Sequence, residues 1–175
     1  MPITPLHLGP ALGIGLPLKR FIHVPTFILA NVMLDLEPFI VLVLGLPYPL
    51  HGYFHTFLLA IPVGVGLSLF MYSTDKYFQS LYKLLLLENG NKKLKAFVAS
   101  GVSGTVLHIL LDSPLYSDIR PFYPVDVNPL YNPSYASIIN DICIFLGLIG
   151  LLYYVVLVIY NVKNKLQRTD TNLKK

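Results

Sequence analysis

Two uninterrupted apolar stretches constrain the fold of this chain more than any other feature of the sequence. Residues 56–74 and residues 142–160 each contain nineteen consecutive positions without a formal charge. An α-helix of that length is roughly 28 Å long, close to the ~30 Å hydrocarbon thickness of a lipid bilayer. The sequence therefore predicts an integral membrane protein in which both stretches are spanning helices.

The composition agrees with this prediction. Of the 175 residues, 54% are hydrophobic and only 13% are charged, whereas soluble domains carry about 25% charged residues. So few charged side chains cannot cover a water-exposed globule. The length is sufficient for one membrane domain of roughly four to six short helices. The single cysteine, Cys143, excludes an intrachain disulfide.

Three weaker apolar segments are candidates for further helices. Residues 96–111 are rich in small side chains, which allow helices to approach closely in a membrane. Residues 25–46 are long enough to span, but two acidic residues and Pro38 interrupt them, so we expect the helix to end or kink there. Residues 6–18 are short and contain two prolines. Together these segments predict an all-α membrane protein with about five transmembrane or membrane-embedded helices.

The connections between these helices define the predicted organisation. Residues 113–133 are rich in proline and tyrosine and predict an outer loop with little regular structure. Residues 75–95 are polar, and residues 77–87 within them predict an amphipathic helix on the membrane surface. Residues 1–162 are thus predicted to form one polytopic membrane domain. Residues 163–175 predict a basic, disordered cytoplasmic tail.

Positive charge predicts the orientation of the chain in a cell membrane. All basic residues except Arg120 fall at residues 19–20, within residues 76–95 or after residue 160. Positively charged connections stay in the cytoplasm, so we expect the N-terminus outside and the C-terminus inside a multi-pass protein. Because these charges lie in short groups between apolar runs, membrane lipid and not nucleic acid is the expected partner.

With this topology, several polar side chains converge on the outer side of the membrane. They come from different helices: His7, Asp35, His55, His108 and Asp112. His108 and Asp112 are four residues apart and share one helix face. An imidazole nitrogen and a carboxylate oxygen at that spacing can bind the same cation. Because an unpaired carboxylate at membrane depth is costly, Asp35 is expected to face protein, water or a cation.

Other polar residues have a simpler interpretation beside the functional one. His51 is four residues before His55, but a histidine at the end of a span commonly hydrogen-bonds a carbonyl group at the interface. Arg120 is either an anchor at the membrane interface or a contact for an anionic head group. His23 lies close to Lys19 and is expected to be structural.

In order and spacing, these residues resemble the YdjM-type family of membrane-bound metal-dependent hydrolases, over most of the chain from residue 7 to about residue 124. The resemblance is carried by Leu6-His7-Leu8-Gly9, Leu34-Asp35-Leu36-Glu37-Pro38, Gly52-Tyr53-Phe54-His55-Thr56 and His108-Ile109-Leu110-Leu111-Asp112-Ser113-Pro114. That family is distantly similar to zinc-dependent phospholipases C, which are all-helical enzymes with His/Asp metal clusters. The resemblance implies that His7, Asp35, His55, His108 and Asp112 are metal ligands. It places Glu37 where many relatives have aspartate, and His51 where relatives have arginine.

The sequence hypothesis is therefore a metal-dependent hydrolase of a lipid-like or phosphoester substrate, with Zn²⁺ as the expected divalent metal. Asp35 would ligate or bridge metal ions, and Glu37 would act as general base. Arg120, and more weakly His51, would contact substrate. Two alternatives stay open. One is a structural or partner-binding membrane protein whose polar cluster holds helices together, and the other is a metal or proton transporter.

Overall fold

The computed structural model describes residues 5–88 and 92–173, and all regular secondary structure in these ranges is helical. The elements in chain order are η1 (Pro5–His7), α1 (Leu8–Gly15), α2 (Val24–Met33), α3 (Leu36–Leu44), η2 (Tyr53–His55), α4 (Phe57–Leu84), α5 (Leu94–Asp112), η3 (Pro133–Tyr135) and α6 (Ala136–Leu173). The η elements are single 3-10 turns. The predicted all-α membrane fold is confirmed.

Four segments of the described chain are long and apolar enough to cross a membrane. They are Val24–Leu44, Phe57–Leu84, Leu94–Asp112 and Pro133–Gln167. These segments support a location in a membrane, whereas the sides on which the two termini lie stay a prediction. The fifth predicted segment forms only the eight-residue α1, roughly 12 Å long, which is too short to span a bilayer.

The first spanning segment is broken where its acidic residues lie, as predicted. Helix α2 ends at Met33 and α3 begins at Leu36, so Asp35 occupies the junction between them. The break lies just before Pro38, which falls in the first turn of α3, where a missing backbone N–H costs little. Gly45 ends α3 in the left-handed conformation, with φ of 59°. The junction places the Asp35 side chain inside the helical bundle, where it is 4% exposed.

Two predictions about the polar connections are wrong. Helix α4 continues without a break to Leu84, so residues 77–84 extend a spanning helix and are not a separate surface helix. Helix α6 likewise continues to Leu173 and includes most of the predicted disordered tail. Leucine, lysine and glutamine are good helix formers, so a helix already started in an apolar run extends into both segments. Residues 174–175 of the tail lie outside the described residues.

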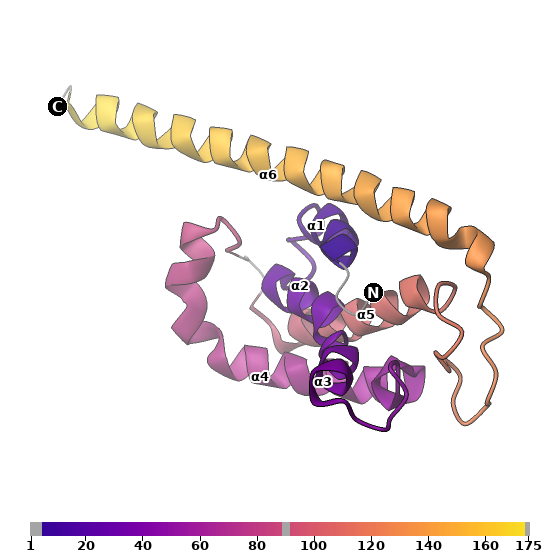
Figure 1. The fold of residues 1–175 in the computed structure, drawn as a ribbon. Helices are drawn as coiled ribbons and strands as arrows, with labels where there is room; N and C mark the ends of the chain where they lie inside the picture. The colour runs from indigo at the N-terminus through magenta and orange to yellow at the C-terminus, as the bar shows by residue number, and fades with distance from the viewer. Residues whose placement is uncertain (1–4, 89–91, 174–175) are drawn as a thin grey trace.

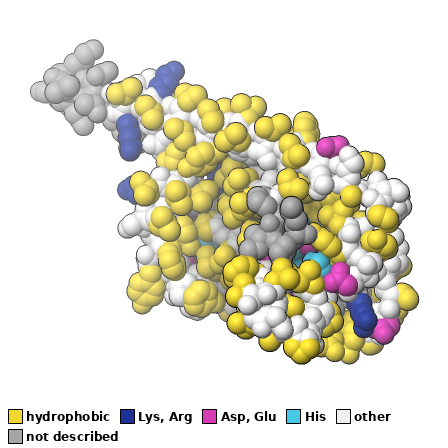
Figure 2. Space-filling view, viewed as in Figure 1, with side chains coloured by type: hydrophobic (Ala, Val, Ile, Leu, Met, Phe, Trp, Pro, Cys, Tyr) yellow, Lys and Arg dark blue, Asp and Glu magenta, His cyan; other side chains and the backbone are white. Residues whose placement is uncertain are grey.

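The helices are arranged around α2 and α5, which lie in the middle of the molecule (Figure 1). Helix α4 lies on one side of this pair, and the long α6 lies on the opposite side with α1 beneath it (Figure 1). Figure 2 shows hydrophobic side chains over most of one face of the molecule. Many large apolar side chains are exposed, Leu148 and Leu152 of α6 among them. Such a surface suits contact with lipid.

Glycine residues bring two pairs of helices into close contact. Between α4 and α5, a Cβ atom added to Gly101 would lie only 2.2 Å from the carbonyl oxygen of Gly64. Between α1 and α6, a Cβ atom on Gly9 would lie 2.0 Å from the carbonyl oxygen of Cys143. A Cβ atom on Gly13 would lie 2.3 Å from the carbonyl oxygen of Leu146. Helix α1 is therefore held on α6 by backbone-to-backbone packing.

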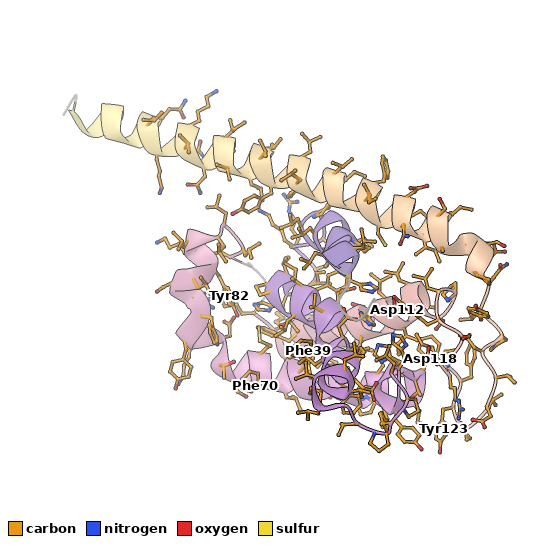
Figure 3. The ribbon with its side chains drawn as sticks, viewed as in Figure 1. Phe39, Phe70, Tyr82, Asp112, Asp118 and Tyr123 are labelled. Atoms are coloured by element: carbon orange, nitrogen blue, oxygen red, sulfur yellow. The ribbon has the colours of Figure 1, made fainter. Side chains whose placement is uncertain are left out.

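A second polar cluster lies around His23, on the loop that precedes α2. His23 Nε2 lies 3.2 Å from Asp75 Oδ1 of α4, and its backbone N–H donates to Ser100 Oγ of α5 at 2.7 Å. Its ring stacks on Phe97, with centroids 3.9 Å apart, and contacts Tyr82 edge-on. Tyr82 and Asp112 lie well apart, to the left and to the right in Figure 3. His23 thus joins α2, α4 and α5 far from the other histidines, in agreement with the structural role expected for it.

The contact between α1 and α6 predicts how glycine substitutions affect stability. Gly13→Ala should lower the unfolding temperature of the detergent-solubilised protein by several degrees, because the added methyl group forces the two helices apart at ~1–3 kcal/mol. Gly66→Ala is the matched control, since a Cβ atom there meets nothing within 4 Å. Thermal denaturation followed by circular dichroism compares the two. Equal unfolding temperatures would contradict close packing of α1 on α6.

The surroundings of His23 predict a loss of stability in acid. Burial lowers the pKa of His23 to about 4, although the neighbouring Asp75 carboxylate raises it. The unfolded chain takes up a proton near pH 6.5, so stability falls between about pH 6.5 and pH 4. The His23→Gln variant should lose less stability over this pH range, because glutamine does not titrate. Unfolding temperatures of both proteins across this pH range give the comparison, and parallel curves would contradict the prediction.

Candidate metal centre

Six titratable side chains from four parts of the chain meet at the end of the bundle where α5 ends. His7 closes η1, Asp35 lies between α2 and α3, and His108 and Asp112 lie in the last turns of α5. His55 closes η2 just before α4, and His51 lies in the loop ahead of it. Each of the six is at most 4% exposed. The structure thus brings together all five predicted ligands, and it adds His51.

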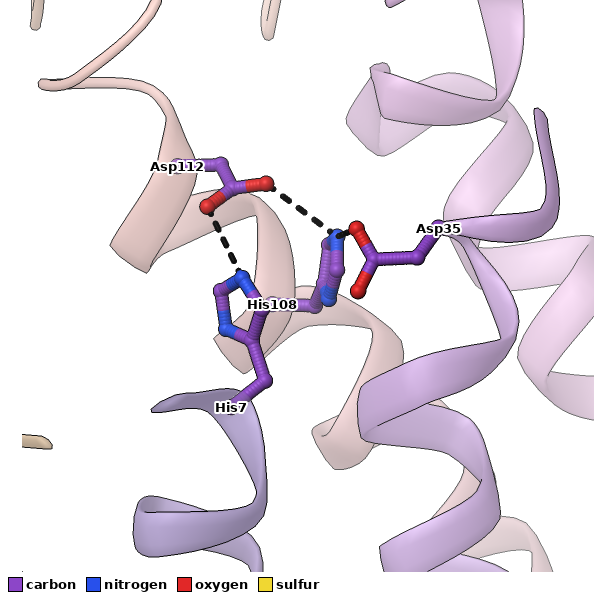
Figure 4. A group of neighbouring side chains, drawn as sticks. All are labelled: His7, Asp35, His108 and Asp112. Atoms are coloured by element: carbon purple, nitrogen blue, oxygen red, sulfur yellow. Dashed lines mark ion pairs between the residues drawn. The ribbon is translucent and has the colours of Figure 1, made fainter. Parts of the chain in front are cut away.

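Four of these residues form a first group around Asp112 (Figure 4). Asp112 Oδ1 lies 3.0 Å from His7 Nε2, and Asp112 Oδ2 lies 3.3 Å from His108 Nε2. Asp35 Oδ1 approaches His108 Nε2 from the other side at 3.7 Å. One nitrogen or oxygen atom from each of the four lies within 4.8 Å of the others. This buried group can hold a metal ion.

A second group shares Asp112 with the first. His51, His55 and Asp112 each offer one atom within 4.8 Å of the others. The groups also meet directly, because His55 Nε2 lies 3.3 Å from His108 Nε2. A carboxylate has two oxygen atoms and can bind two cations at once. The two groups therefore overlap at Asp112, and each of them could hold a metal ion.

In three of the histidines, a hydrogen bond at Nδ1 orients the ring. His108 Nδ1 lies 2.7 Å from the carbonyl oxygen of Asn31. Since a carbonyl group only accepts, His108 carries a proton on Nδ1, and its Nε2 atom faces Asp112. His55 Nδ1 lies 2.9 Å from Glu37 Oε2, and His51 Nδ1 lies 3.0 Å from both carboxylate oxygens of Asp118. Metal-binding histidines characteristically have such partners, which fix the ring and its tautomer.

Some buried polar atoms of the cluster lack hydrogen-bond partners in the described part of the chain. With Nδ1 of both His55 and His108 bonded elsewhere, their Nε2 atoms lie 3.3 Å apart. Among the described residues, His7 Nδ1 and Asp35 Oδ2 have no hydrogen-bond partner although both are buried. Burial of unpaired polar atoms is costly, and a cation bound by the cluster would offset part of that cost. The donor set, nitrogen and carboxylate oxygen, fits Zn²⁺ and similar divalent ions.

Glu37 holds the segment that carries His55. Its carboxylate accepts hydrogen bonds from the backbone N–H groups of Gly52 and Phe54, from the Tyr48 hydroxyl at 3.2 Å and from His55 Nδ1. Burial lowers the pKa of His55, an effect that its hydrogen bond to Glu37 partly offsets. A low pKa keeps the ring in the neutral form that binds metal. Glu37 therefore acts on His55 in this structure, and its predicted role as general base stays a prediction.

Arg120 lies outside the cluster, at a cavity that borders it. The cavity has a volume of about 180 Å³, and His51, Asp118 and Tyr123 also line it. The Arg120 guanidinium is exposed and forms an ion pair with Asp126. Asp118 and Tyr123 lie at the same end of the molecule as Asp112 (Figure 3). Arg120 thus shares a cavity with His51 and stays a candidate substrate contact.

Asp118 and Asn31 are the partners of His51 and His108, and neither was predicted from the sequence. Asp118 lies in the loop after α5 and resembles an ordinary loop residue in the sequence. Asn31 contributes a backbone oxygen, and any residue type can supply that atom. No spacing rule joins either residue to its histidine, because the pairs lie 67 and 77 residues apart.

Comparison of the whole chain with known protein families, with curated proteins and with solved structures finds no match. The resemblance to the YdjM-type family therefore stays a prediction, and the geometry of the cluster carries the functional argument.

The hydrogen bond from His55 to Glu37 predicts the metal affinity of a variant. Glu37→Gln removes one negative charge and places an amide N–H near backbone donors, so the His55 ring loses its fixed orientation. We expect zinc affinity to fall by about 10–100-fold, measured by zinc titration of detergent-purified protein. Glu88→Gln, on an exposed residue of the same type, is the control. Unchanged affinity in Glu37→Gln would show that His55 does not bind the metal.

Proposed function

We propose that this chain is a membrane-embedded, metal-dependent hydrolase that acts on a lipid-like or phosphoester substrate. The observation that carries the proposal is the buried cluster itself. It has four imidazole rings and two carboxylates at one end of the bundle, and three of the rings have an outer hydrogen-bond partner. Buried polar atoms without a hydrogen-bond partner among the described residues, such as Asp35 Oδ2, favour a metal centre over a purely structural cluster.

A divalent ion bound in this cluster would supply the chemistry of hydrolysis, because it activates water near neutral pH and polarises the scissile bond. The protein side chains have separate roles. The ring nitrogens of His7, His55 and His108 would hold the ion, and Asp112 would offset its charge. Asp35 has one carboxylate oxygen without a hydrogen-bond partner, so it can accept a proton from the attacking water.

The position of the cluster supports a substrate that comes from the membrane. Three of its six residues lie in spanning segments or at their ends, and the other three lie close to the start of a helix. The cavity beside His51 gives access from outside the bundle. The positive-inside rule predicts that this end faces outward. A lipid head group at the outer membrane surface would therefore lie at the same level as the cluster.

One observation favours the non-enzymatic alternative. His7 and Asp112 form an ion pair at 3.0 Å, which joins the start of α1 to the end of α5. Buried pairs of this kind can serve mainly to hold a unique arrangement of helices. In that case the cluster would stay closed and bind no metal.

The experiment that separates the two functions compares wild type with His108→Ala, Asp35→Asn and the exposed control Asp141→Asn. Metal content after zinc loading is measured by inductively coupled plasma mass spectrometry. Hydrolysis is measured with a chromogenic phosphodiester. We expect wild type to bind zinc and to hydrolyse the substrate, with chelator abolishing and zinc restoring activity. His108→Ala should lose metal, and Asp35→Asn should lower the rate by at least ~100-fold.

Two results would contradict the proposal. If zinc-loaded wild type binds no metal and His108→Ala only unfolds more easily, the cluster is structural. If wild type binds metal but Asp35→Asn hydrolyses the phosphodiester at the wild-type rate, Asp35 has no part in the reaction.

A further inference from the structure

A large apolar groove lies between α3 and α4, next to the metal centre. Its volume is about 520 Å³, and its walls include Ile40 and Val41 of α3 and Leu59 and Val63 of α4. The charged residue in its lining is Glu37. The groove therefore offers hydrocarbon contacts along its length and a polar group where it meets the metal centre.

The groove opens toward lipid. Both of its walls belong to segments that are long and apolar enough to span a membrane. Leu36 and Ile40 in its lining are 54% and 47% exposed. Water does not reach such a surface inside a bilayer, and the molecules that surround it there are lipid acyl chains. An acyl chain that fills the groove would gain close packing that a flat helix surface does not offer.

The groove and the cavity beside His51 share part of their lining. Tyr48 and Tyr53 line both spaces. Glu37 lines the groove and hydrogen-bonds the ring of His55 at 2.9 Å. His51 lines the cavity, and it belongs with His55 to the second group of candidate ligands. A molecule with an apolar part in the groove and a polar part in the cavity would lie against His51 and against Glu37, the hydrogen-bond partner of His55.

The cavity suits an anionic group. Arg120 lines it and is half exposed, and its Asp126 partner is more exposed still. Exposed ion pairs contribute little stability, so a phosphate group can replace Asp126 at low cost. Guanidinium groups bind phosphate through two hydrogen bonds at once. The lining also includes the Asp118 carboxylate, which is paired with His51, and the hydroxyls of Tyr48 and Thr56.

We propose that the α3–α4 groove binds one acyl chain of a phosphate-bearing membrane lipid, whose head group occupies the cavity beside His51. This inference rests on the proposed hydrolase function, and it names the substrate class as a lipid phosphoester that enters sideways from the bilayer. Arg120 is then the residue that selects an anionic head group.

Lipid retention tests the groove without any turnover. The protein is reconstituted in vesicles of phosphatidylcholine with a minor fraction of phosphatidic acid, extracted in mild detergent, and the bound lipid counted by native mass spectrometry. Ile40→Trp, which fills the groove, should lower retained phosphatidic acid by about tenfold. Leu152→Trp, on a lipid-facing residue of α6 that is 67% exposed, should retain as much as wild type. Arg120→Gln should lower retention of phosphatidic acid but not of phosphatidylcholine.

A second variant and a second readout keep the outcomes separate. Val63→Phe narrows the groove from the α4 wall, so it replaces Ile40→Trp if that variant no longer binds zinc like wild type. Equal retention in wild type and the groove variants, or equal loss in Leu152→Trp, would overturn the inference. Hydrolysis of a water-soluble phosphodiester is measured in parallel. If the groove variants lose bound phosphatidic acid but wild type hydrolyses no substrate, the hydrolase function is refuted and the lipid site is supported. If wild type hydrolyses the substrate but the groove variants retain as much lipid as wild type, the hydrolase function is supported and the lipid site is refuted.

Discussion

The burial of the Asp112 carboxylate is the constraint on which the rest of the structure depends. The residue lies in the last turn of α5, where the helix dipole disfavours a negative charge, and it is only 2% exposed. A carboxylate in such a place needs close positive or hydrogen-bonding partners. His108 comes from the preceding turn of the same helix, and His7 comes from the other end of the sequence. The folding of several distant segments is therefore coupled to one charged group.

Helix α1 shows how the apolar packing serves this cluster. It is too short to span a membrane, and it carries His7 immediately before its first residue. Glycines on α1 allow its backbone to rest directly on α6, so α6 determines how far His7 lies from Asp112. On the other side, the glycine contact between α4 and α5 positions His55 relative to His108. Glycines at the apolar helix contacts thus help to set the distances between the side chains of the polar cluster.

The sequence allows much of this to be predicted, and the failures have physical reasons. Hydropathy and length predicted the spanning segments, because a bilayer demands apolar runs of a given length. Helical spacing paired His108 with Asp112, because residues four apart share a face. The end of α4 was predicted wrongly. The charge of Asp75 suggested that a loop begins there, but Asp75 lies within the helix and is paired with His23 inside the bundle. The contacts of His51 and Asn31 depend on how loops meet in three dimensions, which no local pattern encodes.

The groove and the cluster support one account, in which apolar packing and metal chemistry meet at Glu37. That residue lines the groove, closes the turn that carries His55 and orients its ring. If the cluster is a metal centre, histidine nitrogens and aspartate oxygens bind a metal ion at this point. X-ray absorption at the zinc edge of the zinc-loaded wild-type protein detects these ligands. We expect nitrogen and oxygen ligands at ~2.0–2.2 Å with the scattering pattern of several imidazole rings. Zinc bound through sulfur at ~2.3 Å, or no zinc retained by the folded protein, would contradict this interpretation.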